Sequence, residues 1–364
     1  MNKEAVGLHL DGVTSVRPFR DYYEQRNGTV AQYLARYLNL PYQDSTEPTV
    51  GLDRLYTVPA KTLLKSRAHA MGIETEGDFY GAAVEHLGHV GKAILHPTIS
   101  EYIPSFYSPL FAREVHPFVL PGLSAFSRED ALESFLRLKK ASPSDYIRFK
   151  APNESDGHGQ YAIATLPEAR KFLNALDNSL VQEQGLVLEL GVQHPSTISA
   201  GFAQIGTDRF SFIADQKNDR GEDGRDRYAG CNVAVVRGSL FDLYRAIPLD
   251  TVHQKALESC AQLYEKYSQF DPIASRLSFD YVYGHTDMGD EVGGVTDITA
   301  RLGGTCPALV LAAEALHDTS KQSVAQAEVT LNYEPEVLLP EEQGAINFID
   351  EPTLRLSARL HHVL

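Results

Sequence analysis

The chain has 364 residues, 43% of them hydrophobic and 22% charged, which provides ample apolar material for a folded core and argues against disorder. At roughly 150 residues per domain, this length predicts two or three domains. The formal net charge of -15 argues against a general nucleic-acid binder, because binding a polyanion depends on Lys and Arg side chains that neutralise phosphates. A small anionic ligand stays compatible, since it needs only a local positive pocket.

The chain shows no membrane or secretory pattern. No uninterrupted apolar run approaches the ~20 residues that a membrane helix needs, and residues 1–5 lack the layout of a signal peptide. We therefore expect a soluble, cytoplasmic protein. The three cysteines are too few and too widely spaced for a disulfide framework or a zinc site, so we interpret them as structural thiols. The three histidines that precede a proline are also too far apart for a metal site, so we interpret them as loop histidines. These residues are Cys231, Cys260, Cys306, His96, His116 and His194.

The first ~115 residues mix short helical patterns with Pro- and Tyr-rich loops and carry no clear motif. A helix is predicted to begin at Ser127, where a Ser cap precedes an acidic residue by three positions. A strand at 146–150 is followed by a loop with Gly157 and Gly159, a short strand at 160–164 and a helix starting near Pro167.

The rest of the chain alternates strands and helices. Strands are predicted at 186–190, 197–205, 209–214, 232–236, 277–283 and 295–300. Helices are predicted at 251–267 and 308–316, a charged loop at 217–227, an acidic loop at 334–342 and a last element at 353–363. This alternation indicates an α/β or α+β enzyme.

Two carboxylates are predicted to face each other across a hairpin. If strands 277–283 and 295–300 pair about a turn between Met288 and Gly289, Asp280 lies opposite Asp297. Like charges in that position are destabilising. A divalent cation would turn the repulsion into binding, because Mg²⁺ takes one or two carboxylates together with phosphate oxygens.

The same register places Ser278 opposite Thr299 and Arg276 opposite Arg301. Paired arginines beyond a metal site suit a phosphoryl group in transfer. The alternative interpretation is an edge hairpin with a solvated, charged face.

Two further charged side chains interrupt apolar strands. Lys150 ends a strand just before the glycine-bearing loop, where a positive charge suits nucleotide phosphates, although a lysine at a strand end is often solvated. Glu189 interrupts the apolar run 186–191. The backbone of this strand could donate and accept hydrogen bonds at a purine edge, and the carboxylate could accept hydrogen bonds from ribose hydroxyls. The alternative is a buried strand whose Glu points to solvent.

The order of these parts resembles the ATP-grasp superfamily over residues 119–316. The segment Val119–Gly122 followed by a capped helix, the strand ending in Lys150 and the hinge-like run 186–191 are similar to its nucleotide-binding module. Residues 278–304 resemble its metal-binding end. The layout is similar to D-alanine–D-alanine ligase and biotin carboxylase, and also to a group of uncharacterised bacterial ATP-grasp-like proteins.

The resemblance implies an ATP-grasp fold with an N-terminal α/β lobe at 1–117, a central lobe at 118–188 and a C-terminal lobe at 189–364, with ATP between the last two. It implies a nucleotide site made by Lys150, Gly157, Gly159, Glu189, Leu190 and Lys217. It implies Mg²⁺ or Mn²⁺ on Asp280, Asp297 and Thr299, and an acyl-phosphate stabilised by Arg276 and Arg301.

The function implied is ATP-dependent ligation of a small-molecule carboxylate to an amine or related nucleophile through an acyl-phosphate, with no nucleic-acid or membrane partner. The resemblance also allows a homodimer. Asp297 and Thr299 stand where the family usually has Glu and Asn, which motivates one alternative, a non-catalytic or regulatory nucleotide-binding protein. A small-molecule phosphotransferase on the same fold is the other alternative.

Overall fold

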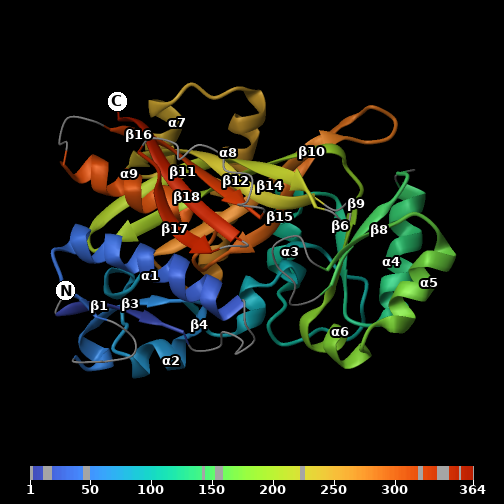
Figure 1. Ribbon diagram of the computed structural model, residues 1–364. Helices are drawn as coiled ribbons and strands as arrows, with labels where there is room; N and C mark the ends of the chain where they lie inside the picture. The colour runs from blue at the N-terminus through green and yellow to red at the C-terminus, as the bar shows by residue number, and fades with distance from the viewer. Residues whose placement is uncertain are drawn as a thin grey trace.

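The computed structural model describes residues 3–10, 19–43, 50–141, 144–151, 159–221, 226–318, 323–333, 344–351 and 354–363. Three groups of elements surround one central region, with the N-terminal part at the lower left of Figure 1, the central lobe at the right and a large sheet above. In the described helices, no segment is long and apolar enough to cross a membrane.

The N-terminal lobe is built on two small sheets, one parallel and one mixed. A three-stranded sheet has the order β2-β1-β3 and packs against the long helix α1. A second sheet, of order β13-β5-β4, brings in a strand from far along the chain. The elements are β1 (Ala5–His9), α1 (Phe19–Leu38), β2 (Tyr42–Gln43), β3 (Leu55–Pro59), β4 (Leu63–Leu64), α2 (Lys65–Ala70), β5 (Ala82–Val84), the 3-10 turn η4 (Lys92–Leu95), α3 (Pro109–Val115) and β13 (Ile273–Ala274).

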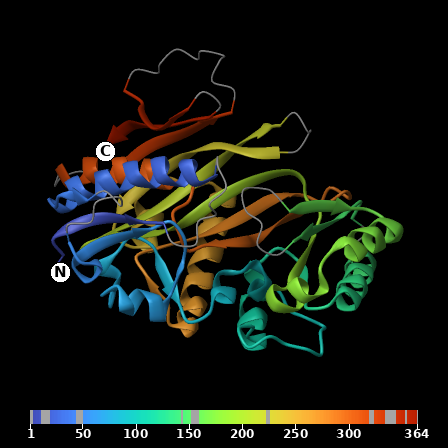
Figure 2. The same cartoon turned by 60° about the horizontal axis from the view of Figure 1, so that its bottom comes forward.

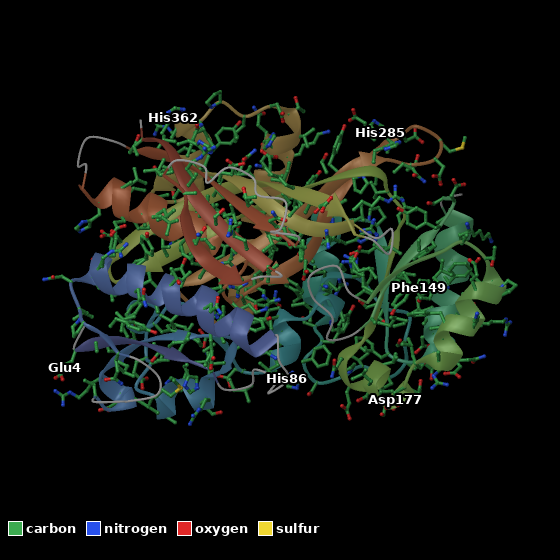
Figure 3. All side chains as sticks on the ribbon, viewed as in Figure 1. Glu4, His86, Phe149, Asp177, His285 and His362 are labelled. Carbon is green, nitrogen blue, oxygen red and sulfur yellow. The ribbon has the colours of Figure 1, made fainter. Side chains whose placement is uncertain are left out.

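The central lobe is a four-stranded antiparallel sheet of order β6-β9-β7-β8. Its apolar face buries Ile147 and Phe149 against α4 and α5, and Phe149 is labelled in Figure 3. The predicted boundary at residue 188 falls inside β9. The elements are β6 (Gly122–Ala125), α4 (Arg128–Ala141), β7 (Ile147–Lys150), β8 (Gln160–Ile163), α5 (Leu166–Ala175), α6 (Asn178–Gln184) and β9 (Leu186–Leu190).

The C-terminal lobe is an eight-stranded antiparallel sheet of order β15-β14-β10-β11-β12-β16-β18-β17. Figure 2 shows its strands running past both the N-terminal and the central lobe. The elements are β10 (Gln193–Ile205), β11 (Asp208–Arg220), β12 (Asp226–Arg237), α7 (Leu240–Ala246), α8 (Thr251–Tyr267), β14 (Arg276–His285), β15 (Glu291–Thr299), α9 (Cys306–Asp318), β16 (Val324–Asn332), β17 (Ile346–Glu351) and β18 (Leu354–Val363).

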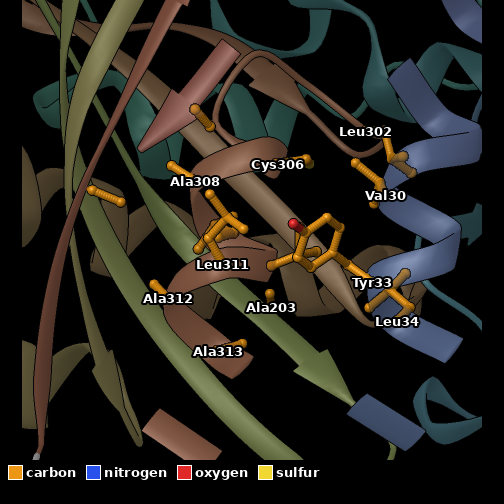
Figure 4. Packing of buried hydrophobic residues seen from close by; sticks show 14 of the residues in the cluster. Val30, Tyr33, Leu34, Ala203, Leu302, Cys306, Ala308, Leu311, Ala312 and Ala313 are labelled. Carbon is orange, nitrogen blue, oxygen red and sulfur yellow. The ribbon is translucent and has the colours of Figure 1, made fainter. Parts of the chain in front are cut away.

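The two faces of this sheet bury different helices, because successive side chains of a strand point to opposite faces. Phe212 of β11 packs in a cluster with α1 and α9, whereas its neighbour Ile213 packs in a cluster with α8. Figure 4 shows the first cluster, in which Tyr33 of α1 lies close to residues of α9. Helices therefore cover the sheet on both faces.

The predicted loop at 217–227 was wrong over most of its length, because β11 continues to Arg220 and β12 begins at Asp226. The alternating charged and polar residues of these arms resemble a loop in sequence, but they pair as an antiparallel ladder. The acidic segment predicted at 334–342 lies outside the described residues. Cys231, Cys260 and Cys306 are buried and unbridged.

A close backbone contact joins the central lobe to the large sheet at Gly294 of β15. The Leu120 amide donates to Val295 O at 3.0 Å, and a Cβ at Gly294 would overlap the backbone of Val119 and Leu120. Only glycine therefore fits this approach without moving one lobe relative to the other.

We predict that Gly294→Ala destabilises the fold by about 1–3 kcal/mol, the usual cost of forcing extra atoms into a packed site. Gly28→Ala in α1 is the matched control, since its Cβ would meet no atom closer than Tyr42 Oη at 3.7 Å. The control should be neutral or slightly stabilising, because alanine suits a helix interior better than glycine. Urea unfolding of both variants measures the difference, and equal free energies of unfolding would contradict the prediction.

Candidate functional site

A cavity of about 630 Å³ lies between the central sheet and the large sheet and extends to α1. Its volume is in the range of small-ligand sites. The acidic side chains that line it are Asp280 and Asp297. The basic side chains that line it are Arg26, Arg148, Lys150, Arg276 and Arg301. The cavity is thus positively charged within a protein of net charge -15, as a site for an anionic ligand requires.

The β14–β15 hairpin places Asp280 directly opposite Asp297, which confirms the predicted register at this point. Ser278 lies opposite Thr299, also as predicted, and both line the cavity. The ladder shifts by one residue between Asp280 and Tyr281, so the bulge lies on the turn side and leaves the carboxylates paired.

Hydrogen bonds fix one carboxylate of the pair. Ser199 donates to Asp280 Oδ1 at 2.6 Å, and Gln216 donates to Ser199 at 2.9 Å. Burial and the facing Asp297 carboxylate together raise the pKa of Asp280. Asp297 Oδ2 lies 3.4 Å from Lys92 Nζ. The pair therefore carries an electrostatic strain that a cation relieves.

These donors fit a hard cation better than a softer metal ion that prefers imidazole or thiolate ligands. Carboxylate oxygens and the Thr299 hydroxyl are oxygen ligands, and Mg²⁺ needs one or two carboxylates when phosphate oxygens complete its shell. Within the described ranges, no group of three or more His, Cys, Asp or Glu side chains is placed to hold a metal by itself. Asp280 and Asp297 thus fit a Mg²⁺ ion that a nucleotide shares.

Lys150 lies at the wall of the cavity and forms a buried ion pair. Its Nζ is 2.6 Å from Glu189 Oε2 and donates to Thr296 O at 3.0 Å. Glu189 Oε1 in turn lies 3.0 Å from His96 Nε2. Burial alone would raise the pKa of Glu189, but Lys150 and His96 outweigh it and lower the pKa to about 2. Burial lowers the pKa of Lys150.

Gly122 makes room for this arrangement. It pairs with Glu189 in the β6–β9 ladder, and a Cβ there would lie 2.6 Å from Leu188 O, 3.0 Å from His96 Nδ1 and 3.1 Å from Glu189 Cγ. The Pro-Gly segment of the sequence therefore serves to admit the imidazole beside the carboxylate.

The two predicted arginines lie at the α9 end of the cavity but not as a cross-strand pair, which corrects the predicted register beyond Thr299. Arg276 is 1% exposed and donates to Thr299 O at 2.9 Å and Thr305 Oγ1 at 3.0 Å. Arg301 lies beyond the end of β15 and donates to Leu302 O at 3.3 Å. The chain turns after Thr299, so the ladder stops before it reaches Arg301.

Among the described residues, four predicted nucleotide contacts do not line the cavity: Gly159, Glu189, Leu190 and Lys217. Glu189 is fully buried by its two partners, and Leu190 packs into the core of the central lobe because it points to the opposite face of β9. Lys217 forms an ion pair with Glu328, whereas its neighbours Gln216 and Asn218 line the cavity. Strand alternation turns Lys217 away from the site, which contradicts its predicted phosphate contact.

The glycine-bearing loop is described only at its ends. Gly157 lies outside the described residues. Gly159 has φ +69°, a left-handed conformation that favours glycine, and its carbonyl accepts from the Ala151 amide at 2.8 Å. The two ends of the loop are thus held together directly after Lys150.

Sequence reasoning missed four residues at or beside the site. Lys92 and His96 lie in and after the short η4 turn, which has no clear signal in the sequence. Gln216 carries no distinctive pattern either. Arg26 belongs to an N-terminal lobe in which we recognised no motif, and its place in the cavity depends on how α1 docks.

Solved structures share this architecture over nearly the whole chain. A carboxyaminoimidazole ribonucleotide synthase from Aspergillus clavatus, complexed with ATP, is 9% identical, with a TM-score of 0.54 over 99% of this chain and 94% of that chain. The biotin carboxylase domain of Hydrogenobacter thermophilus 2-oxoglutarate carboxylase, in complex with MgADP, ADP and bicarbonate, is 12% identical, with a TM-score of 0.54 over 98% of this chain and 86% of that chain.

The protein therefore has an α/β ATP-grasp fold, as the sequence predicted. Residues 17–353 match the profile of the family described as "Protein of unknown function (DUF3182)", and the chain belongs to that family. No curated protein sequence matches the chain.

We predict that Glu189→Gln lowers the free energy of unfolding by about 3–5 kcal/mol at pH 7, because it leaves the buried Lys150 ammonium without its partner charge. The double variant Lys150→Met with Glu189→Gln should recover most of that loss, since no unpaired charge is left. Urea unfolding measures both.

The pH dependence gives a second readout. Because the folded pKa of Glu189 is about 2, against an ordinary value of 4.5, its contribution is present above pH 4.5 and is lost as pH falls towards 2. The difference between wild type and Glu189→Gln should shrink in that window. A difference that does not depend on pH would contradict the ion pair.

Asp280→Asn should have the opposite effect on stability. The raised pKa of Asp280 means that its negative charge destabilises the folded protein. This destabilisation is absent below the ordinary carboxyl pKa of about 4. It grows as pH rises through the folded pKa. With EDTA at pH 7, the variant should melt at a higher temperature than wild type, and the gap should close near pH 4. A lower melting temperature at pH 7 would refute this.

Proposed function

We propose that this protein is an ATP-dependent carboxylate–amine ligase that works through an acyl-phosphate. The observation that carries the proposal is the opposed Asp280–Asp297 pair at the edge of a cavity lined by five basic side chains in an ATP-grasp fold. That combination suits MgATP and a second, anionic substrate. The solved structures with this fold add support at the level of the fold.

In this proposal the nucleotide lies between the central sheet and the large sheet. Lys150, with Gly159 at the end of the adjoining loop, binds the ATP phosphates, and Arg148 adds positive charge on the same face of β7. Asp280, Asp297 and the Thr299 hydroxyl hold Mg²⁺, which when bound neutralises charge on the phosphate oxygens. Mn²⁺ suits the same oxygen ligands.

Arg276 and Arg301 orient the carboxylate substrate at the other end of the cavity. A carboxylate oxygen attacks the γ-phosphorus, ADP leaves, and an acyl-phosphate forms. An amine nitrogen then attacks the acyl carbon, phosphate leaves and an amide forms, with the amine losing a proton. The arginine side chains stabilise the negative charge that develops on the transferring oxygens. This chemistry needs positioning and electrostatics rather than a protein nucleophile.

A non-catalytic nucleotide-binding protein is the second candidate. The Asp297–Lys92 contact favours it, because an ammonium 3.4 Å away already neutralises part of the charge that would attract a metal. Thr299, a neutral hydroxyl, adds less affinity than an amide oxygen. This candidate predicts nucleotide binding without turnover.

Calorimetric titration of MgATP into wild type, Lys150→Ala and Asp280→Asn tests the nucleotide site. We expect both variants to weaken binding by about tenfold or more, because each removes a charge-assisted contact. Arg245→Gln, an exposed substitution in α7, serves as the control and should bind as wild type does. A folded wild type that takes up no nucleotide with Mg²⁺ or Mn²⁺ would refute the proposal.

Turnover separates the candidates. ADP release is measured with carboxylates in the presence of hydroxylamine, which traps an acyl-phosphate as a hydroxamate. Hydroxamate formation supports the ligase. A stable phosphorylated product without a nucleophile indicates a phosphotransferase, and binding without ADP release under every substrate indicates the non-catalytic protein.

A further inference from the structure

Three guanidinium groups gather at the α9 end of the cavity. Arg26 comes from α1 in the N-terminal lobe, Arg276 from β14, and Arg301 from the loop before α9. We call these residues the arginine cluster. The cluster joins two lobes of the protein at the end of the cavity where Gly303, Gly304 and Thr305 lead into α9.

Two of these cations converge on one oxygen. Arg26 Nη2 lies 3.5 Å from Leu302 O, and Arg301 Nη1 lies 3.3 Å from the same oxygen. Arg26 is buried, and its guanidinium carbon lies 5.3 Å from the centre of the Tyr23 ring. A bound anion beside both guanidinium groups would lower the repulsion between them.

In the described ranges, the hydrogen bonds of the third arginine go to neutral oxygen atoms. Arg276 contacts Thr299 O, Thr305 Oγ1 and the Phe212 ring, and in the described part of the chain its buried Nε has no hydrogen-bond partner. All three arginines contact the turn after β15, since Arg26 and Arg301 reach Leu302 O and Arg276 reaches Thr299 O. Holding this turn does not by itself explain why all three side chains also line the cavity.

The cluster supplies more positive charge than one carboxylate needs. A single carboxylate is satisfied by one bidentate arginine, whereas several arginines suit a phosphate or a second carboxylate. Asp280 and Asp297 lie in the same cavity, but in the proposed function their charge is used by the metal. Arg26, from a helix outside the nucleotide-binding sheets, is placed to act on the substrate.

We propose that the substrate of this site carries a second anionic group, a carboxylate or a phosphate besides the carboxylate that is activated, and that Arg26 together with Arg301 binds it. The claim about the substrate rests on the proposed ligase function. Arg26 acts here as a specificity residue, because it selects dianionic over monoanionic substrates without taking part in the chemical step.

Calorimetric titration of the MgADP-loaded protein with malonate, inorganic phosphate and acetate tests this proposal. Malonate or phosphate should bind about tenfold or more tightly than acetate, the scale of one charge-assisted contact. A preference for malonate indicates a dicarboxylate, and a preference for phosphate indicates a phosphomonoester. Equal affinity for all three probes would overturn the proposal.

Variants locate the preference. Arg26→Gln should abolish it while leaving MgADP affinity unchanged, and Arg26→Lys should retain part of it, because the charge stays and the guanidinium fork is lost. Arg245→Gln on the exposed face of α7 is the matched control. A preference that survives Arg26→Gln would overturn the proposal, since phosphate would then be binding elsewhere, for example in the γ-phosphate position.

Thermal unfolding checks that Arg26→Gln folds; if it does not, Arg26→Lys, which keeps the buried charge, gives the test through a partial loss of the preference. The two proposals fail separately. A protein that binds no MgADP refutes the ligase, and the same titrations without nucleotide then still decide the anion site. A protein that binds MgADP but shows no dianion preference refutes the substrate inference alone.

Discussion

A buried chain of contacts through Lys150 and Glu189 holds the lobes around the cavity. Lys150 ends β7 of the central sheet, and its ammonium also donates to Thr296 O in β15 of the large sheet. His96 reaches the same carboxylate from the segment after η4. Removing charges from water is costly, so this chain of contacts is stable only when all its members are present. Its integrity fixes how the two sheets that line the cavity approach each other.

This constraint also sets the electrostatics of the site. Glu189 is buried and paired with Lys150 and His96, so its carboxylate does not line the cavity. The acidic residues that line the cavity are Asp280 and Asp297. The cavity therefore stays positive inside an acidic protein. The carboxylate pair is then a locally negative site among basic side chains. The repulsion between its two carboxylates is unfavourable without a cation and is relieved when one binds.

The architecture separates two tasks along the cavity. The central sheet and the aspartate pair form one end, where the features suit a nucleotide and its metal ion. The arginine cluster forms the other end, where α1 of the N-terminal lobe meets the start of α9. The second end is thus assembled from two lobes and includes Arg26, which lies outside the two sheets that form the first end.

Features that depend on short-range periodicity could be predicted from the residues alone. Strand alternation and one turn were enough to place Asp280 opposite Asp297, and helical spacing was enough to place α8 at 251–267. Only the tertiary structure decided which charges meet across lobes. Lys92 beside Asp297, His96 beside Glu189 and Arg26 beside Leu302 O are long-range contacts. No local pattern encodes them, because they follow from how separately folded sheets and helices dock.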